Sequence, residues 1–241
     1  MYQDKFYQKK ESNSFFNRWK DNNIIEYKTS QKKIRPYKKK ILNILNSKIN
    51  LKKKKVLEIG PFICDLLWTL KRKHKCDVYG IEPSSLACAY SKKNYNLKIE
   101  NSTILKSKLF NLKKENKEKF DIIICDDVLS WLDRECILSC IAVMDWMLKT
   151  NGYIFLRDFS PAFNFAYPNH HWINEKIFNF KQKDGHVQFF LNSGKYSKIF
   201  YKKYITTEHQ KITIKNKEGI TWSDVIIKKI KKFTHPIRKI K

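Results

Sequence analysis

The most regular pattern of apolar and polar positions lies between residues 55 and 157, where short apolar runs alternate with helical patterns. The apolar runs predict strands at 55–59, 77–82, 97–100, 120–125 and 153–157. Apolar spacings of three and four residues predict helices at 66–73, 84–94 and 134–149. Strands that alternate with helices indicate a parallel sheet with helices on both faces. We therefore predict an α/β fold with a Rossmann-like, doubly wound, mostly parallel sheet.

The pattern changes on both sides of this core. Residues 1–50 are polar and basic with scattered aromatic side chains, and Ile41, Leu42 and Leu45 predict an amphipathic helix near their end. The segment 159–185 is rich in aromatic side chains and predicts irregular structure, followed by a short helix at 186–191. Residues 197–204 and 220–227 then alternate like a terminal antiparallel strand pair.

The first two predicted strands end in residues that suit a nucleotide ligand. Gly60 follows the first strand, and Glu82 ends the second, 22 residues later. In Rossmann-type sheets, an acid about 20 residues beyond the first turn accepts hydrogen bonds from a ribose diol. A solvated strand end or a helix cap is the alternative role for Glu82. The spacing favours the ribose role.

Four stretches, in this order, resemble the motifs of class I S-adenosylmethionine-dependent methyltransferases. They are VLEIGP, VYGIEPS, FDIIICDDVLSWLDRE and LKTNGYIFLRDFSP, and together they cover roughly residues 52–160. The resemblance implies S-adenosyl-L-methionine as cofactor. It also implies three parts: an N-terminal extension or lid (1–50), a cofactor-binding core (51–158) and an acceptor-side segment with terminal strands and a basic tail (159–241).

The resemblance also implies where the cofactor would bind. Glu58 would face its ammonium group directly or through water, Glu82 its ribose, and Asn101 its adenine, although a polar turn accounts for Asn101 equally well. Asp126 or Asp127 would meet the methionine end or the acceptor, with helix capping and surface charge as the alternative. The predicted cofactor-binding residues are therefore Glu58, Gly60, Pro61, Phe62, Glu82, Asn101, Asp126 and Asp127.

The turn after the first strand departs from the family. Its usual form is GxGxG, whereas here Phe62 and Cys64 replace the second and third glycines. Glycine permits a positive φ and a close approach of the backbone to a ligand, which Phe62 is expected to hinder. A non-catalytic relative with a degenerate turn therefore stays an alternative. A nicotinamide dehydrogenase is disfavoured, because its GxGxxG fingerprint is missing.

An oxygen or nitrogen acceptor must lose a proton, and histidine suits this task at neutral pH. The candidate catalytic residues are His170 and His171, in the segment after the core, with Asp158 nearby. A structural role is the alternative for each histidine. The spacing of these three residues matches no standard set of metal ligands, so no metal site is predicted. The more distant likeness of RDFSP…HHW…GHVQFFLNSGKY to methyltransferases of bacterial surface-sugar pathways implies a small-molecule or sugar-like acceptor.

The formal net charge of +27 raises the alternative of an RNA-binding methyltransferase. We do not favour it, because only six of the fifty basic residues are arginine, the side chain best suited to reading phosphates and bases. The six cysteines form no CxxC pair and are expected to be free thiols in a reducing compartment. No signal peptide and no apolar run of membrane-spanning length is apparent, so we expect a cytoplasmic protein. The oligomeric state is not predicted.

Overall fold

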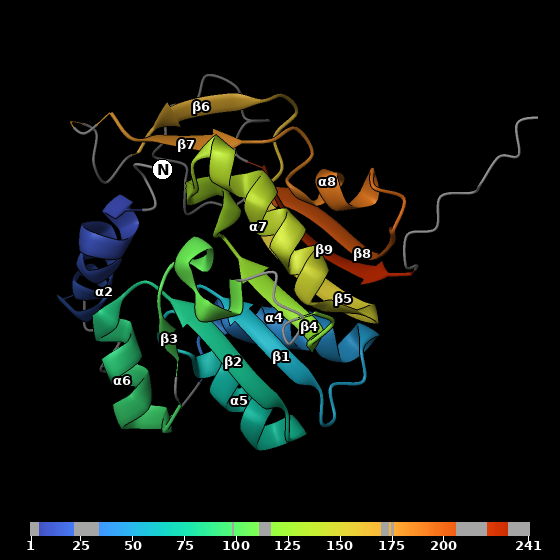
Figure 1. Cartoon of the computed structure of the whole chain (residues 1–241), viewed down its shortest axis with the longest axis horizontal. Coiled ribbons are helices and arrows are strands. Elements are labelled where there is room, and N and C mark those ends of the chain that lie inside the picture. Colours follow the sequence, from blue (N-terminus) through green and yellow to red (C-terminus); the bar gives the residue numbers. More distant parts are fainter. Residues whose placement is uncertain are drawn as a thin grey trace, which may run out of the picture.

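The computed structural model describes residues 5–21, 34–97, 99–110, 117–169, 174, 176–205 and 221–230. Its centre is a seven-stranded sheet with the order β3-β2-β1-β4-β5-β9-β8 (Figure 1). The strands are β1 (Lys55–Ile59), β2 (Asp77–Glu82), β3 (Glu100–Asn101), β4 (Phe120–Asp126), β5 (Leu148–Phe159), β8 (Tyr196–Ile205) and β9 (Thr221–Lys229). The first five pair in parallel, and β9 runs antiparallel to both β5 and β8. The predicted fold class, including the terminal antiparallel pair, is confirmed.

Helices cover both faces of the sheet, and each face has its own hydrophobic core. One face packs against α4 (Pro36–Lys48), α5 (Asp65–His74) and α6 (Ser85–Tyr95). The opposite face packs against α7 (Arg134–Met147) and α8 (Val187–Leu191), which lie in front of the sheet in Figure 1. Alternating residues of one strand serve the two cores: Leu57 faces α7, whereas Val56 faces α4 and α5. This two-sided burial explains the continuous apolar runs in the sequence.

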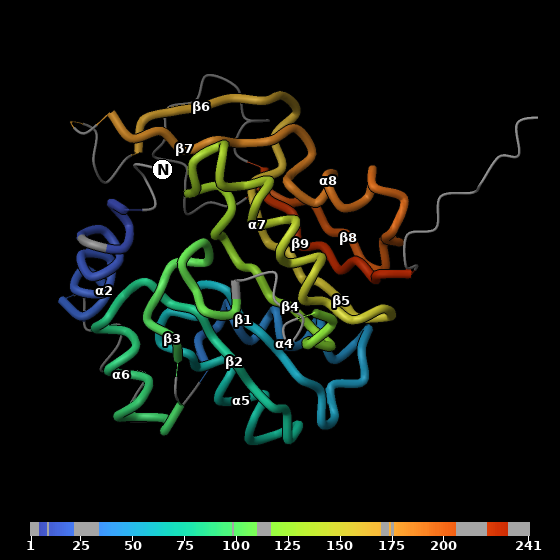
Figure 2. The backbone as a smooth tube through the Cα atoms, in the orientation of Figure 1, coloured from blue at the N-terminus to red at the C-terminus, as the bar shows by residue number. Residues whose placement is uncertain are grey.

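The N-terminal segment forms a π-helical turn, η1 (Tyr7–Glu11), and helix α2 (Ser12–Asp21). Helix α2 packs beside α6, at the edge of the sheet where β3 lies (Figure 2). Asn13 accepts hydrogen bonds from the Ser84 hydroxyl (2.9 Å) and from the backbone N–H of Leu86 (3.3 Å). The N-terminal helix is therefore joined to the loop that follows β2.

The segment after β5 is more regular than predicted. It contains a two-stranded antiparallel sheet of β6 (Phe165–Pro168) and β7 (Phe178–Lys181), which packs on the 3₁₀ turn η5 (Leu129–Trp131). Aromatic side chains are enriched in strands, so the aromatic residues of this segment are consistent with the observed strand pair. The amide of Asn169 donates to the Tyr7 hydroxyl (3.0 Å), so the N-terminal segment also contacts this hairpin.

Two boundaries differ from the sequence prediction. The third strand is β3 at Glu100–Asn101 rather than 97–100, and short 3₁₀ turns η2 (Ile104–Lys106) and η3 (Lys108–Phe110) follow it. Strand β5 begins at Leu148, directly after α7, and its pairing with β4 shifts register before Tyr153. Asn151, which has a φ of +66°, lies inside this irregularity.

All six cysteines are free thiols, as predicted, and five of them are buried. Among the described residues, no helix combines the length and the apolar character that a membrane crossing requires. The basic tail beyond Ile230 lies outside the described residues.

Candidate functional site

A cavity of about 1210 Å³ opens at the carboxyl ends of the parallel strands. Gly60, Glu82 and Asp126 contribute the ends of β1, β2 and β4 to its wall. Helices α2 and α4 and strands β8 and β9 line the remaining sides. Single small-molecule pockets usually measure roughly 300–1,000 Å³. The cavity is therefore larger than a typical single-ligand pocket, and it lies at the edge where open parallel sheets bind ligands.

The turn after β1 keeps the backbone shape of a glycine-rich turn. Gly60, Phe62 and Cys64 have φ values of +67°, +56° and +60°. Adopting a left-handed conformation costs a non-glycine residue roughly 1–2 kcal/mol. Only at Gly60 is glycine also required by space, because a Cβ atom there would lie 2.8 Å from Cγ2 of Val128. The Phe62 and Cys64 replacements are therefore compatible with the left-handed backbone conformation that glycine usually supplies at these two positions.

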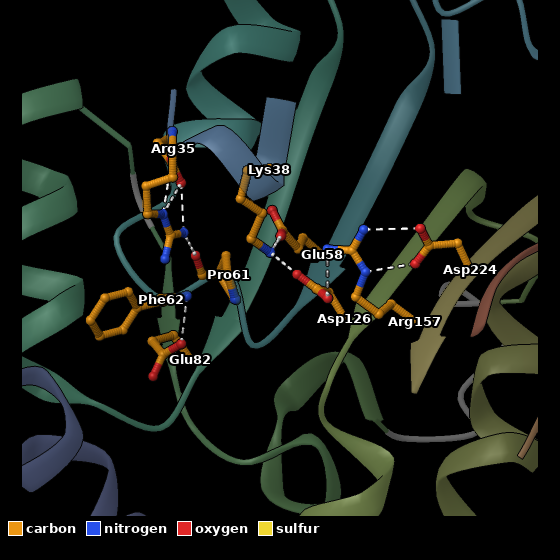
Figure 3. Close-up of polar contacts among 10 residues, drawn as sticks. Arg35, Lys38, Glu58, Pro61, Phe62, Glu82, Asp126, Arg157 and Asp224 are labelled. Atoms are coloured by element: carbon orange, nitrogen blue, oxygen red, sulfur yellow. Dashed lines mark hydrogen bonds and ion pairs between the residues drawn. The ribbon is translucent and has the colours of Figure 1, made fainter. Parts of the chain in front are cut away.

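In Figure 3, the ring of Phe62 points away from the side chains of Lys38, Glu58 and Asp126. Its centroid lies 5.1 Å from that of Phe15, 5.9 Å from that of Phe16 and 5.7 Å from that of Trp19. The guanidinium carbon of Arg35 lies 5.2 Å from the same ring. Phe62 thus anchors α2 against the turn, and this packing offsets the cost of its backbone conformation.

Arg35 fixes the turn from behind. Its guanidinium and its backbone N–H bind the carboxylate of Asp65, the first residue of α5, with donor–acceptor distances of 2.6–3.0 Å. Its NH2 group also lies 3.5 Å from the carbonyl oxygen of Pro61 (Figure 3). Both side chains are 1% exposed. A buried, multiply bonded pair of this kind holds its partners in one geometry.

Glu82 lies in the cavity wall and is held by backbone groups alone. One oxygen accepts a hydrogen bond from the N–H of Phe62 (2.8 Å), and the other accepts one from the N–H of Ser84 (2.8 Å). Burial raises the pKa of Glu82 to about 7, against the effect of these two hydrogen bonds. Each carboxylate oxygen can accept a further bond. Glu82 is thus a buried acceptor with spare capacity facing the cavity.

Glu58 is neutralised within the protein. It is fully buried and does not line the cavity, and Lys38 from α4 binds its Oε1 at 2.5 Å (Figure 3). Its Oε2 has no hydrogen-bond partner among the described residues. Burial raises the pKa of Glu58 in spite of Lys38. The predicted contact with a cofactor ammonium group would have to replace or extend this ion pair.

Lys38 also binds Asp126, so one ammonium group joins the ends of β1 and β4. The distance from its Nζ to Oδ2 of Asp126 is 2.8 Å. Arg157 of β5 lies 3.8 Å from Asp126 and makes two close contacts with Asp224 of β9, at 2.6 and 3.1 Å. Burial opposes ionisation of Asp126, but Lys38 and Arg157 hold its pKa below the usual value. Figure 3 shows these five side chains as one connected network.

The other predicted residues divide between the cavity and its surroundings. Asp127 lines the cavity, and its Oδ1 accepts a hydrogen bond from the indole of Trp131 (3.1 Å). The Asn101 amide instead donates to the backbone carbonyl oxygens of Glu82 and Pro83, both at 3.0 Å. The neighbouring Ser102 and Thr103 line the cavity there.

Asp158 does not line the cavity, since it points to the opposite side of β5 from Arg157. Its carboxylate accepts a hydrogen bond from the Ser130 hydroxyl and contacts Nδ1 of His186. His170 and His171 lie outside the described residues, so their predicted role stays a prediction. Among the described residues, no three His, Cys, Asp or Glu side chains cluster as metal ligands do.

The sequence analysis missed Lys38, Arg35, Arg157 and Asp224. A signal existed for Lys38, which shares its spacing with Ile41, Leu42 and Leu45 on the buried stripe of α4. A lysine on such a stripe indicates a buried acidic partner. Arg157 and Asp224 are neighbours only through the register of β5 and β9, which the sequence does not specify.

Comparison with known proteins identifies the family and the fold. A profile of the methyltransferase domain family matches residues 51–210. A search of curated protein sequences found no match.

A similar fold occurs in the 1,6-didemethyltoxoflavin-N1-methyltransferase of Burkholderia thailandensis, with a TM-score of 0.57 and 12% identity over 91% of this chain and 87% of that one. The magnesium protoporphyrin IX methyltransferase of Synechocystis PCC 6803 is also similar, with a TM-score of 0.58 and 13% identity over 94% of both chains. The [4+2]-cyclase SpnF is also similar (TM-score 0.56, 10% identity, 79% of this chain and 81% of that one). At these identities the structural likeness shows the fold alone. Because the family profile covers most of the chain and agrees with its four motifs, the protein belongs to the methyltransferase domain family, as a class I S-adenosylmethionine-dependent methyltransferase.

Proposed function

We propose that this protein transfers a methyl group from S-adenosylmethionine to a small-molecule acceptor bound in the same cavity. The observation that carries the proposal is Glu82, a buried carboxylate with two backbone hydrogen bonds and spare acceptor capacity toward the cavity. A ribose diol offers two neutral donors to such a group. When bound, the cofactor supplies a methyl group on a positively charged sulfur. The protein aligns that group with the acceptor.

The residues present fit the cofactor. The backbone after β1 has the positive φ values that bring a turn close to a ligand. Two hydroxyl groups of cavity-lining residues, Ser12 Oγ and Thr103 Oγ1, are buried without a hydrogen-bond partner among the described residues. Thr103 follows β3, and Ser12 begins α2, so both border the space next to Glu82. Buried polar atoms without partners are rare and are explained here by a ligand that satisfies them.

The far part of the cavity suits the acceptor. Tyr37 of α4, Tyr204 of β8 and Trp222 of β9 contribute aromatic surface, and the paired Arg157 and Asp224 add polar groups. Small-molecule sites typically combine such apolar walls with a few fixed polar groups. A small or sugar-like acceptor would bind here, beside the end of β4. The residues 159–241 would thus supply much of the acceptor side.

The N-terminal segment would act as a lid. Tyr7, Phe15 and Trp19 line the cavity opposite the strand ends, and Phe62 and Asn13 join the segment to the two loops that flank Glu82. A lid that excludes water favours a reaction in which a charged sulfonium loses its charge. The division into lid (1–50), core (51–158) and acceptor side (159–241) follows from these roles.

Calorimetry with S-adenosylhomocysteine tests the proposal. Wild-type protein should bind, and Glu82→Ala should bind at least about a hundredfold more weakly, because two charge-assisted hydrogen bonds are lost. Glu100→Ala, in the next strand, is the matched control and should bind like wild type. Absence of binding to the wild-type protein would end the enzyme interpretation and favour a non-catalytic relative.

An RNA acceptor rests on the net charge alone. A gel shift with mixed RNA at low salt separates the two acceptor classes, because electrostatic binding of RNA would appear there and weaken steeply with added salt. We expect no shift.

A further inference from the structure

Asp127 has a hydrogen-bond partner at only one of its two carboxylate oxygens among the described residues. It follows β4 with a φ of +56°, and its backbone N–H donates to the carbonyl oxygen of Arg157 (2.8 Å). The indole of Trp131 holds Oδ1, whereas Oδ2 has no hydrogen-bond partner among the described residues. The side chain lines the cavity on the side of Trp131 and Val128. One oxygen is thus fixed and the other is available to a ligand.

The two neighbouring carboxylates are already used. Asp126 binds Lys38 and is close to Arg157, and Asp158 binds Ser130 and His186. Both lie near enough to act electrostatically on Asp127. Their repulsion and the burial of the group disfavour a second and third bare charge at this edge. Asp127 thus has access to the cavity and an oxygen with neither a hydrogen bond nor an ion pair among the described residues, whereas Asp126 is paired with two cations.

A buried lysine packs near the same indole that donates to Asp127. Lys181 of β7 is 3% exposed, and its Nζ lies 3.5 Å from the ring centroid of Phe159 and 5.5 Å from that of Trp131. This ammonium group has no hydrogen-bond partner among the described residues. A buried, unpaired ammonium is costly, so its retention calls for an electrostatic role. Asp158 and Asp127 are the charged groups that act on it electrostatically.

The charges of the pair oppose the effect of burial. Burial raises the pKa of Asp127, and the positive charge of Lys181 draws it back down. Burial likewise lowers the pKa of Lys181, against the pull of Asp158 and Asp127. A general base works best when its pKa lies near the working pH, and an aspartate reaches that range only in such surroundings.

We propose that Asp127 is the catalytic base that takes the proton from the methyl acceptor, and that Lys181 is a positioning residue that keeps this carboxylate ionised. The inference rests on the proposed methyl transfer. The acceptor's O–H or N–H bond breaks, and its proton passes to Oδ2 of Asp127. The acceptor's electron pair forms the new bond to the methyl carbon. The carbon–sulfur bond breaks, and its electron pair stays on sulfur, which becomes neutral.

The test is a pH titration of the full chain, labelled with ¹³C at the aspartate carboxyl carbons and followed by NMR. The Asp127→Asn variant identifies the signal. We expect a wild-type midpoint above about pH 6, compared with about 3.9 for a free aspartate. Lys181→Met should raise the midpoint by about one unit or more, because a positive charge that favours the carboxylate is gone. Lys181→Arg, which keeps the charge, and the exposed Lys183→Met should change it little.

A midpoint near 4, or one that Lys181→Met leaves unchanged, would overturn the proposal. Calorimetry separates it from a role in cofactor binding. Asp127→Asn should bind S-adenosylhomocysteine within about twofold of wild type, and a tenfold loss would make Asp127 a cofactor ligand instead. Failure of the wild-type protein to bind S-adenosylhomocysteine would overturn the proposed function, and this inference with it, whatever the midpoint of Asp127.

Discussion

The buried acids at the ends of the strands are stabilised in two different ways. At the end of β2, Glu82 is held by two backbone N–H groups, and no cation of the described residues forms an ion pair with it. At the ends of β1 and β4, Glu58 and Asp126 share the ammonium group of Lys38, and Arg157 extends the network to β9. The first arrangement leaves hydrogen-bond capacity for a ligand, whereas the second is largely satisfied without one. We infer that Glu82 binds the cofactor, whereas the pairing of Lys38 with Glu58 and Asp126 holds the strand ends in place.

The comparison has a physical basis in desolvation. An ion pair in the interior recovers only part of the cost of burying its charges, and removing one partner exposes the full cost for the other. A carboxylate with backbone partners instead keeps a pKa that burial has raised, as for Glu82. Substitution of Glu82 should therefore mainly alter cofactor binding, and substitution of Lys38 should mainly alter stability. Three predictions follow this division, from the largest effect to the smallest.

Lys38→Met should have the largest effect, a loss of about 3–5 kcal/mol in the free energy of unfolding, because two buried carboxylates lose their shared cation. Urea denaturation followed by circular dichroism measures it. The exposed neighbour provides the control, since Lys39→Met should change stability by less than about 0.5 kcal/mol. A mild effect of Lys38→Met would mean that Glu58 and Asp126 do not depend on this pair.

Phe62→Gly tests the turn after β1, whose backbone N–H at Phe62 donates to Glu82. Truncating a buried phenylalanine costs roughly 3–5 kcal/mol, and relief of the left-handed backbone returns about 1–2 kcal/mol, so we expect a net loss of about 2–3 kcal/mol. Because the ring packs on Phe15, Phe16 and Trp19 of α2, amide hydrogen exchange should rise in residues 12–21. The affinity for S-adenosylhomocysteine should not improve. A clear gain in affinity would show that the ring obstructs the cofactor.

The smallest effect is the pH dependence of cofactor binding. The pKa of Glu82 is raised to about 7, and its ionised form, present above that pH, accepts the ribose hydrogen bonds. Affinity for S-adenosylhomocysteine should therefore fall as pH drops, by about tenfold between pH 8 and pH 6. Glu82→Gln removes the titrating group and should bind weakly with a flatter profile. Equal slopes for the two proteins would assign the dependence to another group.

The sequence predicted the fold well because parallel strands buried on both faces leave continuous apolar runs, as at 120–125. It also placed Glu82 at the end of β2. It did not predict the positive φ of Phe62, because this conformation at a non-glycine residue depends on tertiary packing, here on α2. It missed the β6–β7 pair and the contact of Arg157 with Asp224, since strand register between distant segments is a property of the assembled sheet.

The most direct measurement of the central claim is a crystal structure of the protein with S-adenosylhomocysteine. The account predicts that both ribose hydroxyl groups lie within hydrogen-bond distance of the Glu82 carboxylate. The homocysteine part of the ligand should pass over Gly60, and the Phe62 ring should still pack on α2. A cavity that stays empty at saturating ligand, or an adenosyl group bound away from Glu82, would contradict it.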